Sequence, residues 1–117
     1  IAGRTGAPYI SAYASTKHAL VGLTRALAAE LADKGITVTA LCPGYVDTPM
    51  TDQSVDRIVA RAGVAADVAR EKLVAANPQH RLITAEEVAF VAVTLCDERA
   101  RGVNGQTVGI DGGGFLG

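Results

Sequence analysis

Two short runs of β-branched and apolar residues, 36–42 and 107–111, set the strongest limit on the fold. Each has the length and composition of a strand buried in a parallel sheet. The residues between them have helical spacing, and a strand, helix and strand in this order form a right-handed parallel crossover. Two such strands cannot bury both faces of a sheet, because parallel strands occur almost only in larger, helix-covered sheets. The sequence therefore predicts an α/β fold whose sheet needs further strands.

The start of the sequence leads to a related expectation. The chain begins at Ile1, and its only methionine is Met50. A length of 117 residues allows one domain or less. We therefore expect a C-terminal piece of a longer protein.

Composition argues against several functions. Hydrophobic residues make up 49% of the chain and charged residues 20%, which indicates a globular core. The net charge of −1 gives no electrostatic reason to expect nucleic acid or an acidic membrane as a partner. No apolar run approaches the roughly 20 residues of a membrane helix, and no signal-peptide pattern is present. Cys42 and Cys96 have apolar neighbours, so we expect buried free thiols and a cytoplasmic location.

The longest helix is expected over residues 12–33, after a loop over residues 1–11. Its apolar residues recur at intervals of three and four, and Gly35 is a stop signal. The leucines of this pattern are Leu20, Leu23, Leu27 and Leu31.

The second half of the chain has three shorter helical patterns. Pro49 is expected to keep the chain extended as far as Met50. Two amphipathic segments follow, and we interpret residues 51–81 as a helical lid over a cleft. Thr84 and Glu87 have the spacing of a capping box at the start of the last helix, which should end near residue 96 or 97.

Tyr13 and Lys17 stand four residues apart at the head of the longest helix, so they lie on one face, about one turn apart. A nearby positive charge favours the phenolate, which makes the phenol a usable proton donor and acceptor closer to neutral pH. Two unrelated surface residues would give the same spacing. The pair alone is therefore a weak signal, and the catalytic interpretation depends on the residues that follow.

Three features occur in a fixed order along the chain. They are Tyr13-x-x-x-Lys17, then Pro43-Gly44-Tyr45-Val46-Asp47-Thr48 after a strand, then Gly105 with Asp111-Gly112-Gly113 near the end. Together they resemble the short-chain dehydrogenase/reductase family, in its compact single-domain branch, over essentially the whole chain. The resemblance implies that residues 1–117 form the C-terminal part of one NAD(P)-binding domain, a Rossmann-like doubly wound parallel sheet, with residues 51–81 as its substrate lid.

The resemblance implies an enzyme that interconverts a secondary alcohol and a ketone with NAD or NADP. Tyr13 looks like the acid/base that protonates the carbonyl oxygen as hydride arrives from the nicotinamide. Lys17 looks like its partner, which also hydrogen-bonds the nicotinamide ribose. No metal is expected.

Tyr13 and Lys17 are implied to bind the cofactor as well, together with four further residues. Pro43, Gly44 and Val46 would line the nicotinamide side of the pocket, and Thr48 is similar to the residue that holds the carboxamide. Open α/β sheets bind ligands at the carboxyl ends of their strands, where proline and glycine follow the strand here. Pro43 and Gly44 alone would also make an ordinary turn. The Asp111-Gly112-Gly113 motif is interpreted as structural.

Other family features are expected before Ile1. They are the glycine-rich phosphate loop, the residue that selects NAD or NADP, the catalytic asparagine and a catalytic serine directly before Ile1. The chain alone is therefore expected to be inactive, and the activity is assigned to the longer parent.

The resemblance also limits the substrate. The lid is longer than in small acyl-carrier-protein reductases and more closely resembles that of hydroxybutyrate and hydroxyacyl dehydrogenases. The positions that hold a free carboxylate in hydroxybutyrate-specific members match Ala2 and Ile10, which cannot pair with one. This favours an acyl thioester, a cyclic ketone or another neutral substrate.

Two alternatives stay open at this level. The first is a non-catalytic relative that binds a dinucleotide or a protein. The second is an interaction piece, because the long helix and the last strand make subunit contacts in this family. A homo-oligomer, either dimer or tetramer, is expected.

Overall fold

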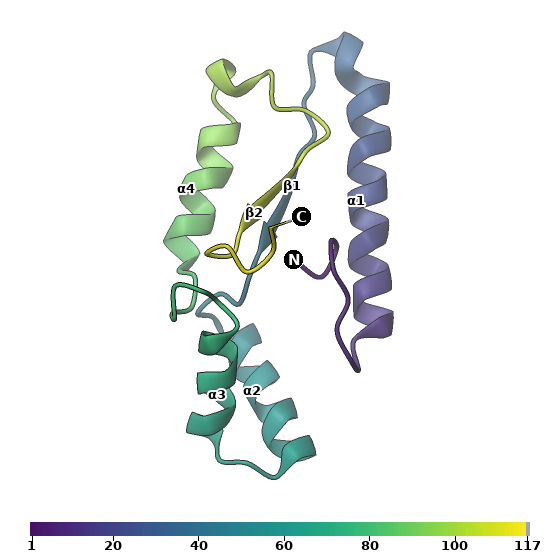
Figure 1. Ribbon diagram of the computed structural model, residues 1–117. Coiled ribbons are helices and arrows are strands. Elements are labelled where there is room, and N and C mark those ends of the chain that lie inside the picture. The colour runs from purple at the N-terminus through teal and green to yellow at the C-terminus, as the bar shows by residue number, and fades with distance from the viewer. Residues whose placement is uncertain (117) are drawn as a thin grey trace.

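The computed structural model describes residues 1–116 as helices around a two-stranded parallel sheet (Figure 1). The elements in chain order are α1 (Ser11–Leu31), η1 (Ala32–Lys34), β1 (Ala40–Pro43), α2 (Pro49–Ala62), α3 (Ala66–Ala75), α4 (Ala85–Leu95), η2 (Glu98–Ala100) and β2 (Thr107–Ile110). Strands β1 and β2 are parallel, with Ala40 opposite Thr107 and Pro43 opposite Ile110. Helices α1 and α4 lie on opposite sides of this sheet (Figure 1). The predicted α/β fold is confirmed.

Strand β1 begins later than residues 36–42 predicted. Val38 donates its N–H to Asn104 Oδ1 at 2.8 Å, and its carbonyl accepts from Gly105 N at 2.8 Å. An asparagine side chain and a turn therefore take the place of the ladder before Ala40. Composition cannot distinguish this arrangement from a strand, because β-branched residues suit both.

Helix α1 packs through small residues rather than through its leucines. Its buried side chains are Ala14, Val21, Thr24 and Ala28. Leu20 and Leu23 retain exposed fractions of 51% and 52%. The helix passes through η1 to Gly35, whose φ of 72° is left-handed, so the predicted stop signal is confirmed.

The segment predicted to be a lid contains an antiparallel pair of helices at one end of the molecule (Figure 1). Helices α2 and α3 share a small core of Val55, Ala69 and Leu73. The prediction that Pro49 keeps the chain extended is wrong, because Pro49 is the first residue of α2. Proline suits that position, since its missing N–H would have no helical partner and its φ is already helical.

Helix α4 begins with the predicted capping box. Thr84 accepts a hydrogen bond from Glu87 N, and the Glu87 side chain accepts from Thr84 N. Cys42 is buried as expected, but the prediction of a buried Cys96 is wrong. Cys96 follows the last residue of α4, where the helix leaves the sheet. Within residues 1–116, the helices lack the length or hydropathy needed to cross a membrane.

Candidate active site

Tyr13 and Lys17 meet on the first two turns of α1. The Lys17 ammonium lies 5.3 Å from the centre of the Tyr13 ring, which is a cation–π distance. The next residue, Ala14, is buried and donates its N–H to Ile10 O at 2.7 Å, which anchors this turn. The Tyr13 side chain is 49% exposed, so its phenol is accessible to a ligand. The structure therefore brings the two predicted catalytic residues together.

The loop before α1 ties this pair to the end of β1. The Ile1 nitrogen donates to Pro43 O at 2.7 Å. Two residues later the loop passes against α1, where a Cβ at Gly3 would lie 2.7 Å from Lys17 O. Only glycine permits this approach. Residues 1–3 of this loop thus contact both Pro43 at the end of β1 and Lys17 in α1.

The connection from β1 to α2 contains the other predicted site residues. Gly44 donates its N–H to Ile110 O at 3.1 Å, which places it at the carboxyl end of the sheet. Val46 forms an isolated parallel bridge with Ile83. Thr48 occupies the N-cap position of α2, but its hydroxyl makes no cap and donates only a long bond, 3.4 Å, to Val46 O. These residues line one continuous turn.

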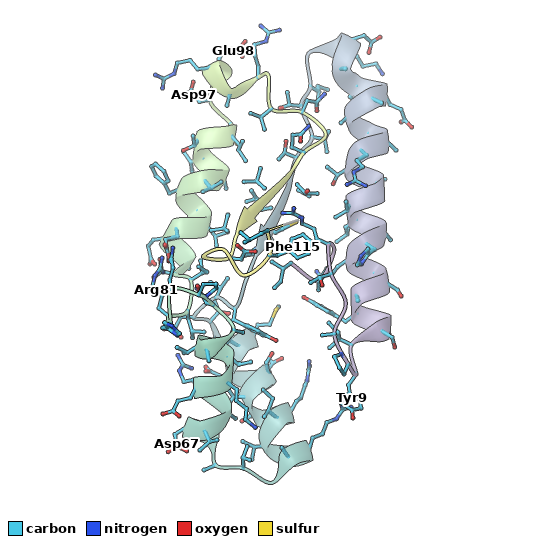
Figure 2. All side chains as sticks on the ribbon, viewed as in Figure 1. Tyr9, Asp67, Arg81, Asp97, Glu98 and Phe115 are labelled. Carbon is cyan, nitrogen blue, oxygen red and sulfur yellow. The ribbon has the colours of Figure 1, made fainter. Side chains whose placement is uncertain are left out.

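Two arginines of the segment predicted to be a lid, Arg70 and Arg61, contact residues outside it. Arg70 of α3 pairs with Asp47, in the turn before α2, at 2.5 Å, and also with Asp52 of α2 at 3.0 Å. The hydrogen bond to Asp47 is the main cause that raises the pKa of Arg70. At the other end of the lid, the Arg61 guanidinium lies 4.6 Å from the centre of the Tyr9 ring. Figure 2 shows Tyr9 at the tip of the loop before α1, facing the lid.

Sequence reasoning missed the role of two residues. Tyr9 lies in the predicted loop 1–11 without any signal that marks it, although its φ of 69° is rare for a non-glycine residue. Asn77 is buried after α3, donates to Arg81 O at 2.8 Å and accepts from Gln79 N at 2.8 Å. Asparagine before Pro78 gave a turn signal, but neither burial nor these partners can be inferred from it.

The structure also places several residues around the predicted site. Ala2 and Ile10 are half-buried and carry no charge. Arg81 pairs with Glu87 at 2.6 Å, and His80 is exposed. Within the part of the chain that the structure describes, no three His, Cys, Asp or Glu side chains gather as a metal site. A cavity of about 310 Å³ between α2 and α3 is lined by residues other than those predicted for the site.

Comparison with known proteins supports the resemblance. A family model described as enoyl-(acyl carrier protein) reductase matches residues 1–114. An uncharacterised oxidoreductase of Bacillus subtilis is 45% identical over 104 residues, which cover 88% of this chain and 40% of that protein. D-beta-hydroxybutyrate dehydrogenase of Rhizobium meliloti is 37% identical over 112 residues, which cover 95% of this chain and 43% of that protein. A crystal structure of actinorhodin polyketide ketoreductase with NADPH superposes with a TM-score of 0.90 at 35% identity. The superposed part covers 95% of this chain and 42% of the ketoreductase.

The chain spans less than half the length of each of these three proteins. Its two strands and flanking helices match the corresponding part of a larger sheet, which confirms the predicted C-terminal part of a Rossmann-like fold. A match of the family model over residues 1–114 leaves almost none of the chain outside it. The chain therefore belongs to the short-chain dehydrogenase/reductase family.

Proposed function

We propose that the chain is the C-terminal part of a longer NAD(P)-dependent oxidoreductase that interconverts a secondary alcohol and a ketone. The polypeptide that contains it together with the preceding half is called the full-length enzyme below. The observation that carries the proposal is the contact between Tyr13 and Lys17, 5.3 Å from ring centre to ammonium, beside the turn that ends β1. Residues 1–117 then form one domain with the missing half, and residues 51–81 are its lid.

The described residues fit a nicotinamide cofactor. The hydroxyl of Thr48 makes no helix cap and is available to a carboxamide. Gly44 lies at the carboxyl end of the sheet, where ligands of such sheets bind. Lys17 offers an ammonium to a ribose hydroxyl. Pro43 and Val46 would complete this wall of the site.

The proposed chemistry divides between cofactor and protein. When bound, the cofactor supplies or accepts the hydride. Tyr13 Oη donates a proton to the carbonyl oxygen in reduction and removes it from the alcohol in oxidation. The Lys17 ammonium stabilises the phenolate that is left after donation. Since this charge is beside the ring in the free protein, it needs no rearrangement at the moment of proton transfer.

The decisive variant is Tyr13→Phe in the full-length enzyme. Loss of the phenolic proton should reduce turnover by about 100-fold or more. Binding of NADH or NADPH, followed by nicotinamide fluorescence, should be nearly unchanged because the ring remains. Tyr9→Phe is the matched control, since it removes a hydroxyl but keeps the ring beside Arg61. Retained turnover in Tyr13→Phe would refute the role, and absence of cofactor binding in the unaltered enzyme would favour a non-catalytic module.

The substrate is proposed to be neutral beside the reacting carbon, such as a 3-oxoacyl thioester or a cyclic ketone. Ala2 and Ile10, at the positions that bind a carboxylate in hydroxybutyrate-specific members, are uncharged and half-buried. The relatives include both a hydroxybutyrate dehydrogenase and a polyketide ketoreductase by name. Relative rates for a ketone, an acyl thioester and free acetoacetate test the proposal, and preference for acetoacetate would contradict it.

A homo-oligomer in the cytoplasm is the proposed setting. Leu20 and Leu23 on α1 and Phe90 and Val93 on α4 are exposed, and apolar side chains of this kind suit subunit contacts. Two free cysteines suit a reducing compartment. Light scattering of the full-length enzyme measures the oligomeric state.

A further inference from the structure

Asp111 is a buried carboxylate whose hydrogen bonds are incomplete. It directly follows β2, and only 8% of the residue is exposed. Its Oδ1 accepts from Gly113 N at 3.1 Å. Its Oδ2 is buried and has no hydrogen-bond partner among residues 1–116. Such an oxygen is costly in a protein interior, and the usual remedy is an ordered water molecule or ion.

A small cavity adjoins this carboxylate. Its volume is about 30 Å³, and Ile1, Gly44, Tyr45, Asn77 and Asp111 contribute to its lining. One water molecule needs about 10–15 Å³ of such volume, so the cavity suits a single water and is too small for a substrate. A resident metal ion is disfavoured, because no three acidic, histidine or cysteine side chains of the described residues gather there.

Three segments of the chain meet around the cavity. A Cβ at Gly44, in the turn after β1, would lie 3.2 Å from Asp111 Cβ. The end of β2 continues through Gly112, which has a φ of 66°. A Cβ there would lie 2.0 Å from Oδ1 of Asn77, the buried residue after α3. The Pro43–Gly44 turn, the end of β2 and the end of the lid are therefore in direct contact.

We propose that this cavity binds one ordered water molecule that donates to Asp111 Oδ2, and that Asp111 is a positioning residue for the Pro43–Gly44 turn and the lid. The positioning part rests on the proposed function, because it assumes that this turn contacts the nicotinamide. The water donates a hydrogen bond to the buried Oδ2 of Asp111. The carboxylate can then pack beside Gly44 and beside the place where Asn77 meets Gly112 without leaving an acceptor unpaired. This packing limits how far the end of the lid at Asn77 can move relative to the Pro43–Gly44 turn.

The first test is a crystal structure of the unaltered full-length enzyme at a resolution that shows ordered water. We expect one water oxygen about 2.5–3.0 Å from Asp111 Oδ2. The same water should be present in crystals treated with EDTA. A dry cavity, a protein donor in its place or a metal ion removed by EDTA would overturn the assignment. Since this test needs neither a variant nor catalysis, it stands even if Tyr13 proves to have no catalytic role.

The second test is Asp111→Asn, measured below its melting temperature so that the enzyme is folded. We expect the KM for the cofactor to rise by about 10-fold or more, because small misplacements of a binding turn are costly. Hydrogen exchange at the amides of residues 76–83 should become faster. Asp56→Asn is the matched control, an exposed carboxylate on the lid helix α2.

The two tests separate the possible failures. A lower melting temperature with unchanged KM and unchanged exchange would show a merely structural role and overturn the positioning proposal. If Tyr13→Phe loses turnover while Asp111→Asn changes only the melting temperature, the positioning proposal fails and the proposed function still holds. If Asp111→Asn fails to fold, hydrogen exchange in the unaltered enzyme decides: residues 76–83 should be as protected as β1, and rapid exchange there would overturn the proposal.

Discussion

Arg81 and Glu87 form a two-point ion pair at the junction between the lid and α4. Arg81 Nη1 lies 2.7 Å from Glu87 Oε2, and Nη2 lies 2.6 Å from Oε1. The same carboxylate accepts from Thr84 N at 2.8 Å in the capping box. Hydrogen bonding by Arg81 is the main cause that lowers the pKa of Glu87 to about 2. Figure 2 shows Arg81 beside the start of α4. One side chain thus fixes the end of the lid and the first turn of a helix.

This pair predicts a loss of stability in acid. The pKa of Glu87 is about 2 in the folded chain against an ordinary 4.5, so the folded state binds the proton more weakly. The contribution of Glu87 is therefore complete above about pH 4.5 and is lost as the pH falls towards about 2. The melting temperature of the full-length enzyme should fall more steeply across this window than that of Glu87→Gln.

The controls for this prediction are within the same helix. Glu86→Gln removes an exposed carboxylate from the same turn and should keep the steep acid dependence. Asp97, whose pKa is also lowered to about 2 by Arg99, titrates in the same window but is present in all three proteins. Equal acid slopes for the unaltered enzyme and Glu87→Gln would contradict the prediction.

The lid core gives a second prediction. Leu73 is buried between α2 and α3. Leu73→Ala should cost about 2–5 kcal/mol in the stability of the lid, because it removes apolar contacts and leaves a cavity. The expected signs are faster proteolysis within residues 51–81 and a higher KM for the substrate. Val68→Ala on the exposed side of α3 should change lid stability by less than about 0.5 kcal/mol. Equal proteolysis of the two variants would show that α2 and α3 do not depend on this core.

Local signals in the sequence were enough to place most elements. Gly35 ends α1 because a left-handed residue there costs glycine little, and the Thr84–Glu87 spacing starts α4 because both side chains cap backbone groups. These effects involve residues that are close along the chain. The beginning of β1 could not be predicted in the same way, since Val38 pairs with Asn104, whose position depends on the whole crossover.

In the candidate site, too, contacts between residues close along the chain could be predicted, and contacts between distant segments could not. The Tyr13–Lys17 contact follows from helical spacing, and the turn after β1 follows from strand and proline signals. The contacts around Asp111 could not be foreseen, because they join β2, the turn and the end of the lid. A buried acceptor without a partner becomes visible only when the atoms around Oδ2 are known. The exposed Cys96 was missed for a similar reason, since apolar neighbours in sequence do not fix which side of a helix end faces the sheet.

The loop before α1 gives a matched pair of glycine variants. A Cβ at Gly3 would lie 2.7 Å from Lys17 O and 3.0 Å from Val21 Cγ2, so Gly3→Ala must displace the loop or the helix. We expect a loss of about 1–3 kcal/mol in stability and lower turnover, because this loop contacts both α1 at Lys17 and the end of β1 at Pro43. Gly6 lies in the same loop with open space around it, so Gly6→Ala should leave turnover unchanged. Chemical denaturation and steady-state kinetics measure both effects, and similar behaviour of the two variants would contradict the role of the close contact.

The last prediction concerns Lys17 itself. Lys17→Met keeps the length and apolar stem of the side chain but removes the ammonium beside the Tyr13 ring. Without that charge the phenolate left by proton donation is less stable, so proton transfer should be slower. Turnover near neutral pH should fall by about 100-fold or more, and the KM for the cofactor should rise because a ribose contact is lost.

The matched control is Lys34→Met, which removes an exposed lysine from η1 at the far end of α1. It should change neither turnover nor the cofactor KM. A Lys17→Met enzyme with a raised cofactor KM but unchanged turnover at saturating cofactor would assign Lys17 to cofactor binding alone. Because the charge acts on the phenolate and the hydrogen bond acts on the ribose, turnover at saturating cofactor and the cofactor KM report the two roles separately.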